Sequence, residues 1–123
     1  MMNLINLTKE NFNELLSNSE ILVIDCWAPW CGACKEFQPV FEKVAEKFPE
    51  YTFAKLNTQE QKEATDKLGV EHIPTLILFR DEIMLFMQPG YLDESGLEGV
   101  VNQAMGVDMD EVRAHIENQE EME

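Results

Sequence analysis

Apolar positions along the chain follow two spacings, which alternate along the sequence. Residues 21–27 are apolar at nearly every position, and Asp25 is the polar exception. A continuous run of this kind is typical of a central strand that is covered on both faces of a parallel sheet. The apolar residues of 32–48 instead recur at helical spacing. That segment predicts a helix with one buried face, with a kink at Pro39.

The same two patterns place the remaining elements. We expect strands at 3–7, 51–56, 75–80 and 83–88, and helices at 8–17, 58–68, 93–105 and from 108 onwards. Polar residues suited to N-capping stand before these helices: Thr8, Thr58 with Gln61 as its capping-box partner, Asp93, and Asp108 with Glu111. Gly69 and Gly106 are placed to end two of them. Residues 81–82 predict a tight hairpin turn, although they include neither glycine nor asparagine.

The order of these elements predicts an α/β fold. Strands and helices alternate early and a hairpin follows late, so we expect a central mixed sheet of about five strands with helices on both faces. The last helix has only Met109, Val112 and Ile116 as an apolar face, and we expect it to dock weakly or fray. The predicted organisation is one domain over residues 1–106 and an acidic helical extension over 107–123.

Composition narrows the classes of function. The chain has 123 residues, 45% of them hydrophobic, and a net charge of -15, which argues against nucleic-acid binding through a basic surface. Seven acidic residues against Arg113 alone give the extension a net charge of -6, which suits a solvated surface or, alternatively, docking of a basic partner. We find no secretory signal and no run long enough to span a membrane. We therefore expect a cytoplasmic monomer.

Two of the three cysteines form the most informative motif, Cys31-Gly32-Ala33-Cys34. The motif follows the apolar run and opens the long helix, where free N–H groups and the helix dipole stabilise a thiolate. The thiolate is the reactive form in disulfide exchange, so this pair can alternate between a dithiol and a disulfide. The alternative is a zinc site, which would need Cys26 and His72 as further ligands because no second pair of this spacing exists.

Several features in a fixed order give the chain its resemblance to a known family. They are Asp25, Trp27, Trp30, the Cys31–Cys34 motif with Lys35, Pro39, Lys55, Ile73-Pro74-Thr75 and Gly90. With these features, residues 3 to about 106 resemble the thioredoxin family. The resemblance implies the thioredoxin fold and an enzyme that reduces protein disulfides. It also implies recharging by thioredoxin reductase and no bound cofactor beyond the redox-active disulfide.

The resemblance also assigns roles to the site residues. Cys31, expected to be exposed, is the nucleophile, and Cys34 resolves the mixed disulfide that Cys31 forms with a substrate. Asp25 interrupts an apolar strand; if buried, it has a raised pKa and can exchange protons with Cys34. The alternative is a carboxylate at a strand end in water. Lys55 lies on the next strand and modulates Asp25, or is an ordinary exposed lysine.

A flat, largely uncharged docking surface is also implied, formed by Trp30, Gly32, Ala33, Ile73, Pro74 and Gly90. The resemblance implies a cis peptide bond before Pro74, which leaves the Ile73 backbone free to pair with an extended substrate. For Trp30 the alternative is a core aromatic, although its position in a loop favours exposure.

Three residues depart from the family's usual pattern. Ala33 replaces a proline, which predicts a somewhat more oxidising pair. His72 either lies near Cys31 and favours its thiolate or is a solvent-exposed loop residue. Tyr91 replaces a small residue and is expected to narrow the docking groove. Two other functions stay open: an oxidase or isomerase of the same fold, or a non-enzymatic adaptor.

Overall fold

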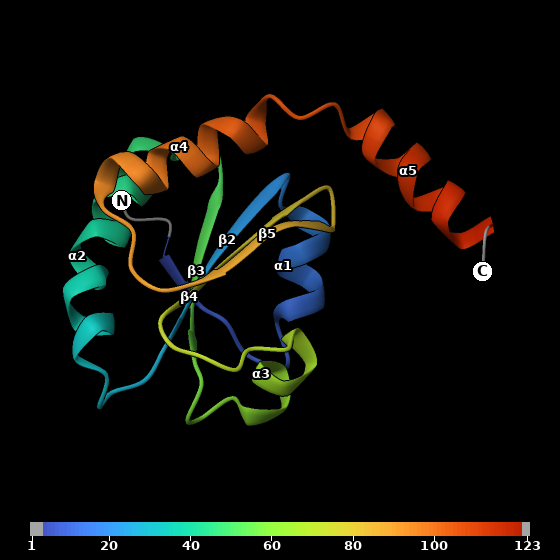
Figure 1. The fold of residues 1–123 in the computed structure, drawn as a ribbon. Helices are drawn as coiled ribbons and strands as arrows, with labels where there is room; N and C mark the ends of the chain where they lie inside the picture. The colour runs from blue at the N-terminus through green and yellow to red at the C-terminus, as the bar shows by residue number, and fades with distance from the viewer. Residues whose placement is uncertain (1–3, 122–123) are drawn as a thin grey trace.

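The computed structural model describes residues 4–121, and its elements follow the predicted order (Figure 1). The strands are β1 (Leu4–Asn6), β2 (Ile21–Trp27), β3 (Thr52–Asn57), β4 (Thr75–Arg80) and β5 (Ile83–Pro89). The helices are α1 (Phe12–Asn18), α2 (Gly32–Lys47), α3 (Lys62–Leu68), α4 (Glu94–Met105) and α5 (Met109–Glu121). Asn3, where the first strand was predicted to start, and Glu123 of the acidic extension lie outside the described residues.

A mixed sheet of 5 strands forms the centre of the molecule, in the order β1-β3-β2-β4-β5. Strands β1, β3 and β2 run parallel, whereas β4 is antiparallel to β2 and β5 is antiparallel to β4. The predicted mixed sheet is therefore confirmed. Residues 21–26 of β2 are all buried, as the continuous apolar run predicted.

Helices cover both faces of the sheet. On one face, α2 and α4 pack on the odd-numbered residues of β2, beginning with Ile21 and Val23. On the other face, α1 and α3 pack on the even-numbered residues Leu22, Ile24 and Cys26. Because side chains alternate along a strand, Asp25 shares the α2 face and Cys26 faces the opposite side.

The first helix begins later than predicted. Thr8 Oγ1 accepts a hydrogen bond from the Asn11 N–H (3.2 Å), and Asn11 Oδ1 accepts one from the Thr8 N–H (2.7 Å). These reciprocal bonds close a turn over residues 9–11, and α1 itself begins at Phe12. Asn11 is therefore the N-cap residue of α1, and the predicted cap at Thr8 is wrong: Thr8 closes the turn that precedes the helix.

The predicted capping box before α3 is wrong. The Thr58 hydroxyl donates to the Trp27 carbonyl (3.0 Å), so it does not cap the helix. Asn57 Oδ1 instead accepts from the Gln59 and Glu60 N–H groups, at 3.0 and 3.3 Å. The chain enters α3 through this turn, and the helix begins at Lys62. The predicted stop is confirmed, because Gly69 takes a left-handed conformation with φ 76°.

The acidic extension forms helix α5, which projects away from the body of the molecule (Figure 1). Asp108 caps it as predicted, because its Oδ1 accepts from the Asp110 and Glu111 N–H groups at 3.0 and 3.2 Å. Met109 is buried, and Arg113 forms an ion pair with Asp81 at 3.0 Å. Both of these contacts lie near the start of α5, and the helix continues to Glu121.

Asp81 and Glu82 form the turn of the β4–β5 hairpin. Both have positive φ, 50° and 68°, the combination that glycine and asparagine usually supply in a two-residue hairpin. The Asp81 N–H donates to the Glu20 carbonyl at 2.9 Å, and the Asp81 carboxylate pairs with Arg113. Asp81 therefore has contacts that explain its presence in the turn, whereas Glu82 has a left-handed backbone and its carboxylate accepts one long hydrogen bond, from the Ser17 hydroxyl at 3.5 Å.

Replacing Glu82 by glycine should stabilise the protein. Glycine adopts the left-handed conformation without the Cβ penalty, which exceeds the extra entropy that glycine loses on folding. We expect Glu82→Gly to raise the free energy of unfolding by about 1 kcal/mol in urea denaturation. Glu50→Gly is the control, since Glu50 lies in a turn without positive φ. An equal gain in that variant would contradict the explanation.

Candidate active site

The two cysteines lie where β2 passes into α2. The connection is short: β2 ends at Trp27, and Cys31 is the N-cap residue of α2, with φ -91° and ψ 112°. The Cys31 N–H donates to the Ala28 carbonyl (3.2 Å), and the Cys34 N–H donates to Cys31 Sγ (3.2 Å). The helix N-terminus thus directs a backbone donor at the sulfur of Cys31, an arrangement that favours a thiolate there.

Cys31 and Cys34 are joined by a disulfide, with their Cα atoms 5.2 Å apart. Their side chains differ little in accessibility, since Cys31 is 8% and Cys34 is 3% exposed. The prediction that Cys31 is exposed is therefore wrong for this oxidised form, although Cys31 remains the more accessible of the two. Ala28 joins the pair in a small buried cluster, against which Trp27 and Ile73 pack.

Asp25 is fully buried on the face of β2 that α2 covers. Neither carboxylate oxygen has a hydrogen-bond partner among the described residues. Loss of hydration disfavours the charged form and raises the pKa of Asp25 to about 7, while the positive charge of Lys55 acts in the opposite direction. The alternative of a carboxylate in water at a strand end is therefore wrong.

A cavity of about 240 Å³ connects Asp25 with Cys34. Asp25, Cys34 and Lys55 line it, together with Trp27, Ala28, Pro29, Lys35 and Gln38. Since a water molecule takes up roughly 30 Å³ in the liquid, this space can hold several. No hydrogen bond links Asp25 directly to Cys34 among the described residues, so a proton passing between them would travel through water.

Lys55 lies beside Asp25 because the two residues are partners across the parallel β2–β3 pair. Its Nζ lies 4.7 Å from the centroid of the Trp27 ring, a cation–π arrangement. Lys55 therefore has a defined place between an aromatic ring and the buried carboxylate, unlike an ordinary exposed lysine.

The segment before β4 lies beside the disulfide. The peptide bond between Ile73 and Pro74 in this segment is cis, as predicted. Pro74 is buried, and Ile73 packs against the cysteine cluster. The Pro74 carbonyl accepts a hydrogen bond from the Gly90 N–H at 2.8 Å. Gly90 has φ 109°, a conformation that few residues other than glycine adopt, and so it suits this close approach of β5 to the proline segment.

The other residues predicted for the docking surface are largely accessible. Trp30 is 68% exposed, which rules out the core alternative, and Gly32 and Ala33 are exposed in the first turn of α2. Tyr91 packs its ring against Phe37, with centroids 5.6 Å apart, and its hydroxyl donates to the Glu36 carbonyl (3.3 Å). Tyr91 therefore lies against α2, and the narrowing of the docking groove stays a prediction.

Cys26 lies apart from these groups, whereas His72 lies at their edge and lines a cavity with Trp30 and Ile73. Cys26 is buried on the opposite face of the sheet, where burial and the charge of Asp25 raise the pKa of its thiol. His72 is exposed, and its carbonyl accepts a hydrogen bond from the Thr75 hydroxyl. Within residues 4–121 no group of three or more histidine, cysteine or acidic side chains is gathered as a metal site would require.

Sequence reasoning missed the neighbours that complete the site. Gln38 lines the cavity beside Asp25, and Glu71, Thr58 and Gln59 line a second cavity beside Trp30. These residues come from separate elements and follow no motif or spacing. The only signal for Glu71 was its position three residues before Pro74.

Comparisons with known proteins agree with this geometry. The thioredoxin family model matches residues 3–103. A protein of Streptomyces coelicolor described as putative thioredoxin 2 is 44% identical over 120 residues, covering 98% of this chain and 90% of its own. The thioredoxin of Alicyclobacillus acidocaldarius is 39% identical over 93 residues, covering 75% of this chain and 89% of its own.

A solved structure extends the likeness to three dimensions. A mutant thioredoxin from Halobacterium salinarum NRC-1 superimposes with a TM-score of 0.79 at 25% identity, covering 85% of this chain and 93% of that one. The region matched by the family model contains the disulfide, Asp25, Lys55 and the cis-proline segment, and it ends before α5. Separately, none of the helices within residues 4–121 has the length and apolar character that crossing a membrane requires.

The burial of Asp25 predicts a pH-dependent cost to stability. Between the ordinary carboxyl pKa of about 4 and the folded value of about 7, the folded protein holds a proton that the unfolded chain has lost. Stability should fall as pH rises through this window and level off above it. Three pKa units correspond to about 4 kcal/mol.

The Asp25→Asn variant lacks this titration. Its stability advantage over the wild type should be near zero below about pH 4 and reach a few kcal/mol above about pH 7. Urea denaturation of both oxidised proteins across this range measures the difference. Asp66→Asn, which removes an exposed carboxylate on α3, is the control and should show no such trend. A constant difference between wild type and Asp25→Asn would contradict the burial argument.

Proposed function

The chain belongs to the thioredoxin family and acts by dithiol–disulfide exchange, and on that basis we propose that it reduces protein disulfides in the cytoplasm. In this proposal thioredoxin reductase returns the oxidised protein to its dithiol form, so that the chain carries electrons between the reductase and substrates. The protein works as a monomer and needs no bound cofactor, since the Cys31–Cys34 pair stores both electrons. The observation that carries the proposal is this pair at the N-terminus of α2.

The first step belongs to Cys31. As a thiolate it attacks one sulfur of a substrate disulfide, a bond forms between Cys31 and that sulfur, and the other substrate sulfur leaves as a thiolate that takes up a proton. The backbone N–H of Cys34, 3.2 Å from Cys31 Sγ, and the helix dipole both favour the attacking thiolate. Cys31 is also the more exposed residue of the pair.

The second step belongs to Cys34. Its thiol loses a proton and attacks the Cys31 sulfur, which re-forms the Cys31–Cys34 disulfide and releases the second substrate thiol. Asp25 is the proposed proton acceptor, acting through water in the cavity that both residues line. A pKa of about 7 suits a group that must take and return a proton near neutral pH. Lys55 sets the balance by favouring the carboxylate form.

The docking surface explains how a polypeptide substrate is held. No hydrogen bond among the described residues uses the backbone N–H or C=O of Ile73, while the residue itself packs beside the disulfide. An extended substrate segment can therefore pair with this backbone as an added strand. Trp30, Gly32, Ala33 and Gly90 supply the surrounding surface and carry no charge themselves, with the buried Pro74 beneath them.

Cysteine variants test the order of the two steps and exclude an adaptor. The Cys34→Ser variant should accumulate a covalent mixed disulfide with an oxidised protein substrate, because the resolving thiol is missing. The Cys31→Ser variant should form essentially none. Non-reducing gel electrophoresis after incubation with insulin measures both. Equal, non-covalent retention of partners by both variants in a pull-down would instead indicate an adaptor.

The reduction potential tests the direction of electron flow. The protein is equilibrated with a dithiol redox buffer, and Trp30 fluorescence reports the fraction that is reduced. We expect a reduction potential in the range of thioredoxins, about -270 mV. Ala33→Pro should lower the potential by roughly 30 mV, since Ala33 lies in the first turn of α2, where proline fits and a backbone N–H has no intrahelical partner to lose. A wild-type value near about -120 to -180 mV would favour the oxidase or isomerase alternative.

A further inference from the structure

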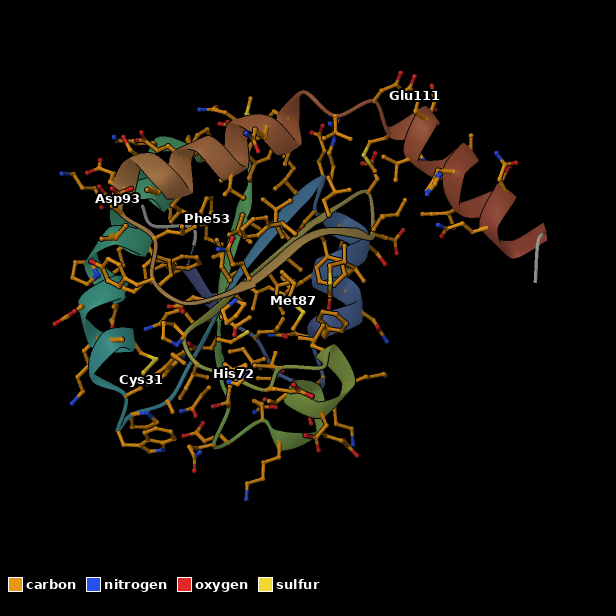
Figure 2. All side chains as sticks on the ribbon, viewed as in Figure 1. Cys31, Phe53, His72, Met87, Asp93 and Glu111 are labelled. Atoms are coloured by element: carbon orange, nitrogen blue, oxygen red, sulfur yellow. A yellow bond between two sulfur atoms is a disulfide. The ribbon has the colours of Figure 1, made fainter. Side chains whose placement is uncertain are left out.

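A second cavity lies beside the disulfide and takes no part in the chemistry described above. It has a volume of about 240 Å³ and is lined by Trp30, Thr58, Gln59, Thr65, Val70, Glu71, His72 and Ile73. Two of these residues border the reactive pair directly, because Trp30 precedes Cys31 and Ile73 packs against the cysteine cluster. Figure 2 shows Cys31 and His72 at the same end of the molecule. A side chain close to a substrate's reacting cysteine can therefore reach this cavity.

The two threonine hydroxyl groups in the walls of the cavity have their protons engaged, so towards a ligand they can only accept hydrogen bonds. Thr58 Oγ1 donates to the Trp27 carbonyl, and Thr65 Oγ1 donates to the Gln61 carbonyl. Both hydroxyl protons are thus used within the protein. What remains is an apolar wall formed by Val70 and Ile73, the exposed indole of Trp30, and the polar side chains at the rim.

Charge at the rim favours a cation. Glu71 is exposed and belongs to none of the ion pairs that the structure records within residues 4–121. No lysine or arginine lines the cavity, whereas Lys35 and Lys55 line the separate cavity at Asp25. The whole chain carries a net charge of -15, so its long-range field also attracts basic substrates.

Trp30 adds a second attraction for positive charge. The face of an indole ring binds ammonium and guanidinium groups, and the other tryptophan of this chain already does so, with Lys55 Nζ 4.7 Å from the Trp27 centroid. No such contact is recorded over the Trp30 ring in the described part of the chain, and Trp30 is 68% exposed. Its ring is available to a cation from outside.

We propose that this cavity binds an arginine or lysine side chain that flanks the reacting cysteine of a protein substrate, with Trp30 and Glu71 as its specificity determinants. The apolar wall accommodates the methylene stem, the indole face and the Glu71 carboxylate receive the charged end, and the preferred substrates are disulfides in basic sequence. The inference rests on the proposed function, because it concerns which disulfides are reduced.

Synthetic disulfide peptides test the proposal. One intramolecular disulfide is kept constant, and arginine, glutamine or glutamate is placed in turn at each of the two positions on either side of the reacting cysteine. The readout is the rate constant for oxidation of the reduced protein by each peptide. At one or more positions we expect arginine to react about three- to tenfold faster than glutamine, and glutamate to react more slowly than glutamine.

Variants with the same change of charge at two places distinguish the effect of the cavity on substrate preference from the effect of the protein's overall negative charge. Glu71→Gln should reduce the ratio of the arginine rate to the glutamine rate to near one, and Glu71→Lys should reverse the preference in favour of glutamate. Glu111→Gln makes the same change of charge on α5, far from Cys31 in Figure 2, and should leave the ratio unchanged. Trp30→Phe, which keeps an aromatic ring with a weaker cation–π interaction, should lower the ratio partially.

The outcomes distinguish failure of this proposal from failure of the proposed function. If the glutamine peptides are reduced but arginine gives no advantage at any position, the specificity proposal is wrong and the function stands. A preference for arginine that Glu71→Gln preserves, or that Glu111→Gln removes equally, assigns selectivity to the overall charge and also overturns the proposal. If no peptide is reduced, the proposed function itself fails.

Discussion

The position of β2 in the middle of the sheet is the constraint on which the redox site depends. Helices cover both faces of this strand, so nearly every side chain along it is buried, and a carboxylate placed at Asp25 has no access to bulk water. The same strand ends one short loop before α2, which places Cys31 at the helix N-terminus. One strand thus supplies a buried proton acceptor and, a few residues later, an activated sulfur. Its alternating side chains also place Cys26 on the opposite face, away from that chemistry.

The site combines groups that are unfavourable for stability with surroundings that keep them in place. A buried carboxyl without a partner is destabilising, yet the strands on either side of β2 and the helices above it fix Asp25 beside the cavity that leads to Cys34. Ile73, from a later segment of the chain, packs on the other side of the disulfide, and Gly90 holds the adjoining Pro74 through a backbone hydrogen bond. The free energy gained by burying the apolar core offsets the free-energy cost of the buried carboxyl, so this small domain tolerates that group.

The sequence predicts those parts of the fold that depend on periodicity and on motifs. The buried run of β2, the apolar face of α2, the hairpin and the caps at Asp93 and Asp108 could all be predicted, because each has a local physical cause. The start of α3 could not, since Thr58 has a tertiary partner, the Trp27 carbonyl, that competes with capping. The low exposure of Cys31 and the place of Glu71 beside Trp30 likewise depend on contacts between distant segments, which no single stretch of sequence encodes.

Arg80 gives the C-terminal extension a defined direction. Its guanidinium donates to the carbonyls of Ala104 and Val107, at 2.6 and 2.8 Å, and so holds both the end of α4 and the connection to α5. Its sequence neighbour Asp81 then pairs with Arg113 in the first turns of α5. The extension therefore leaves the domain on the side away from Cys31 and His72 (Figure 2). A fluorophore, tag or fused domain attached beyond α5 would accordingly start from a point remote from the disulfide and leave the path of an approaching polypeptide open.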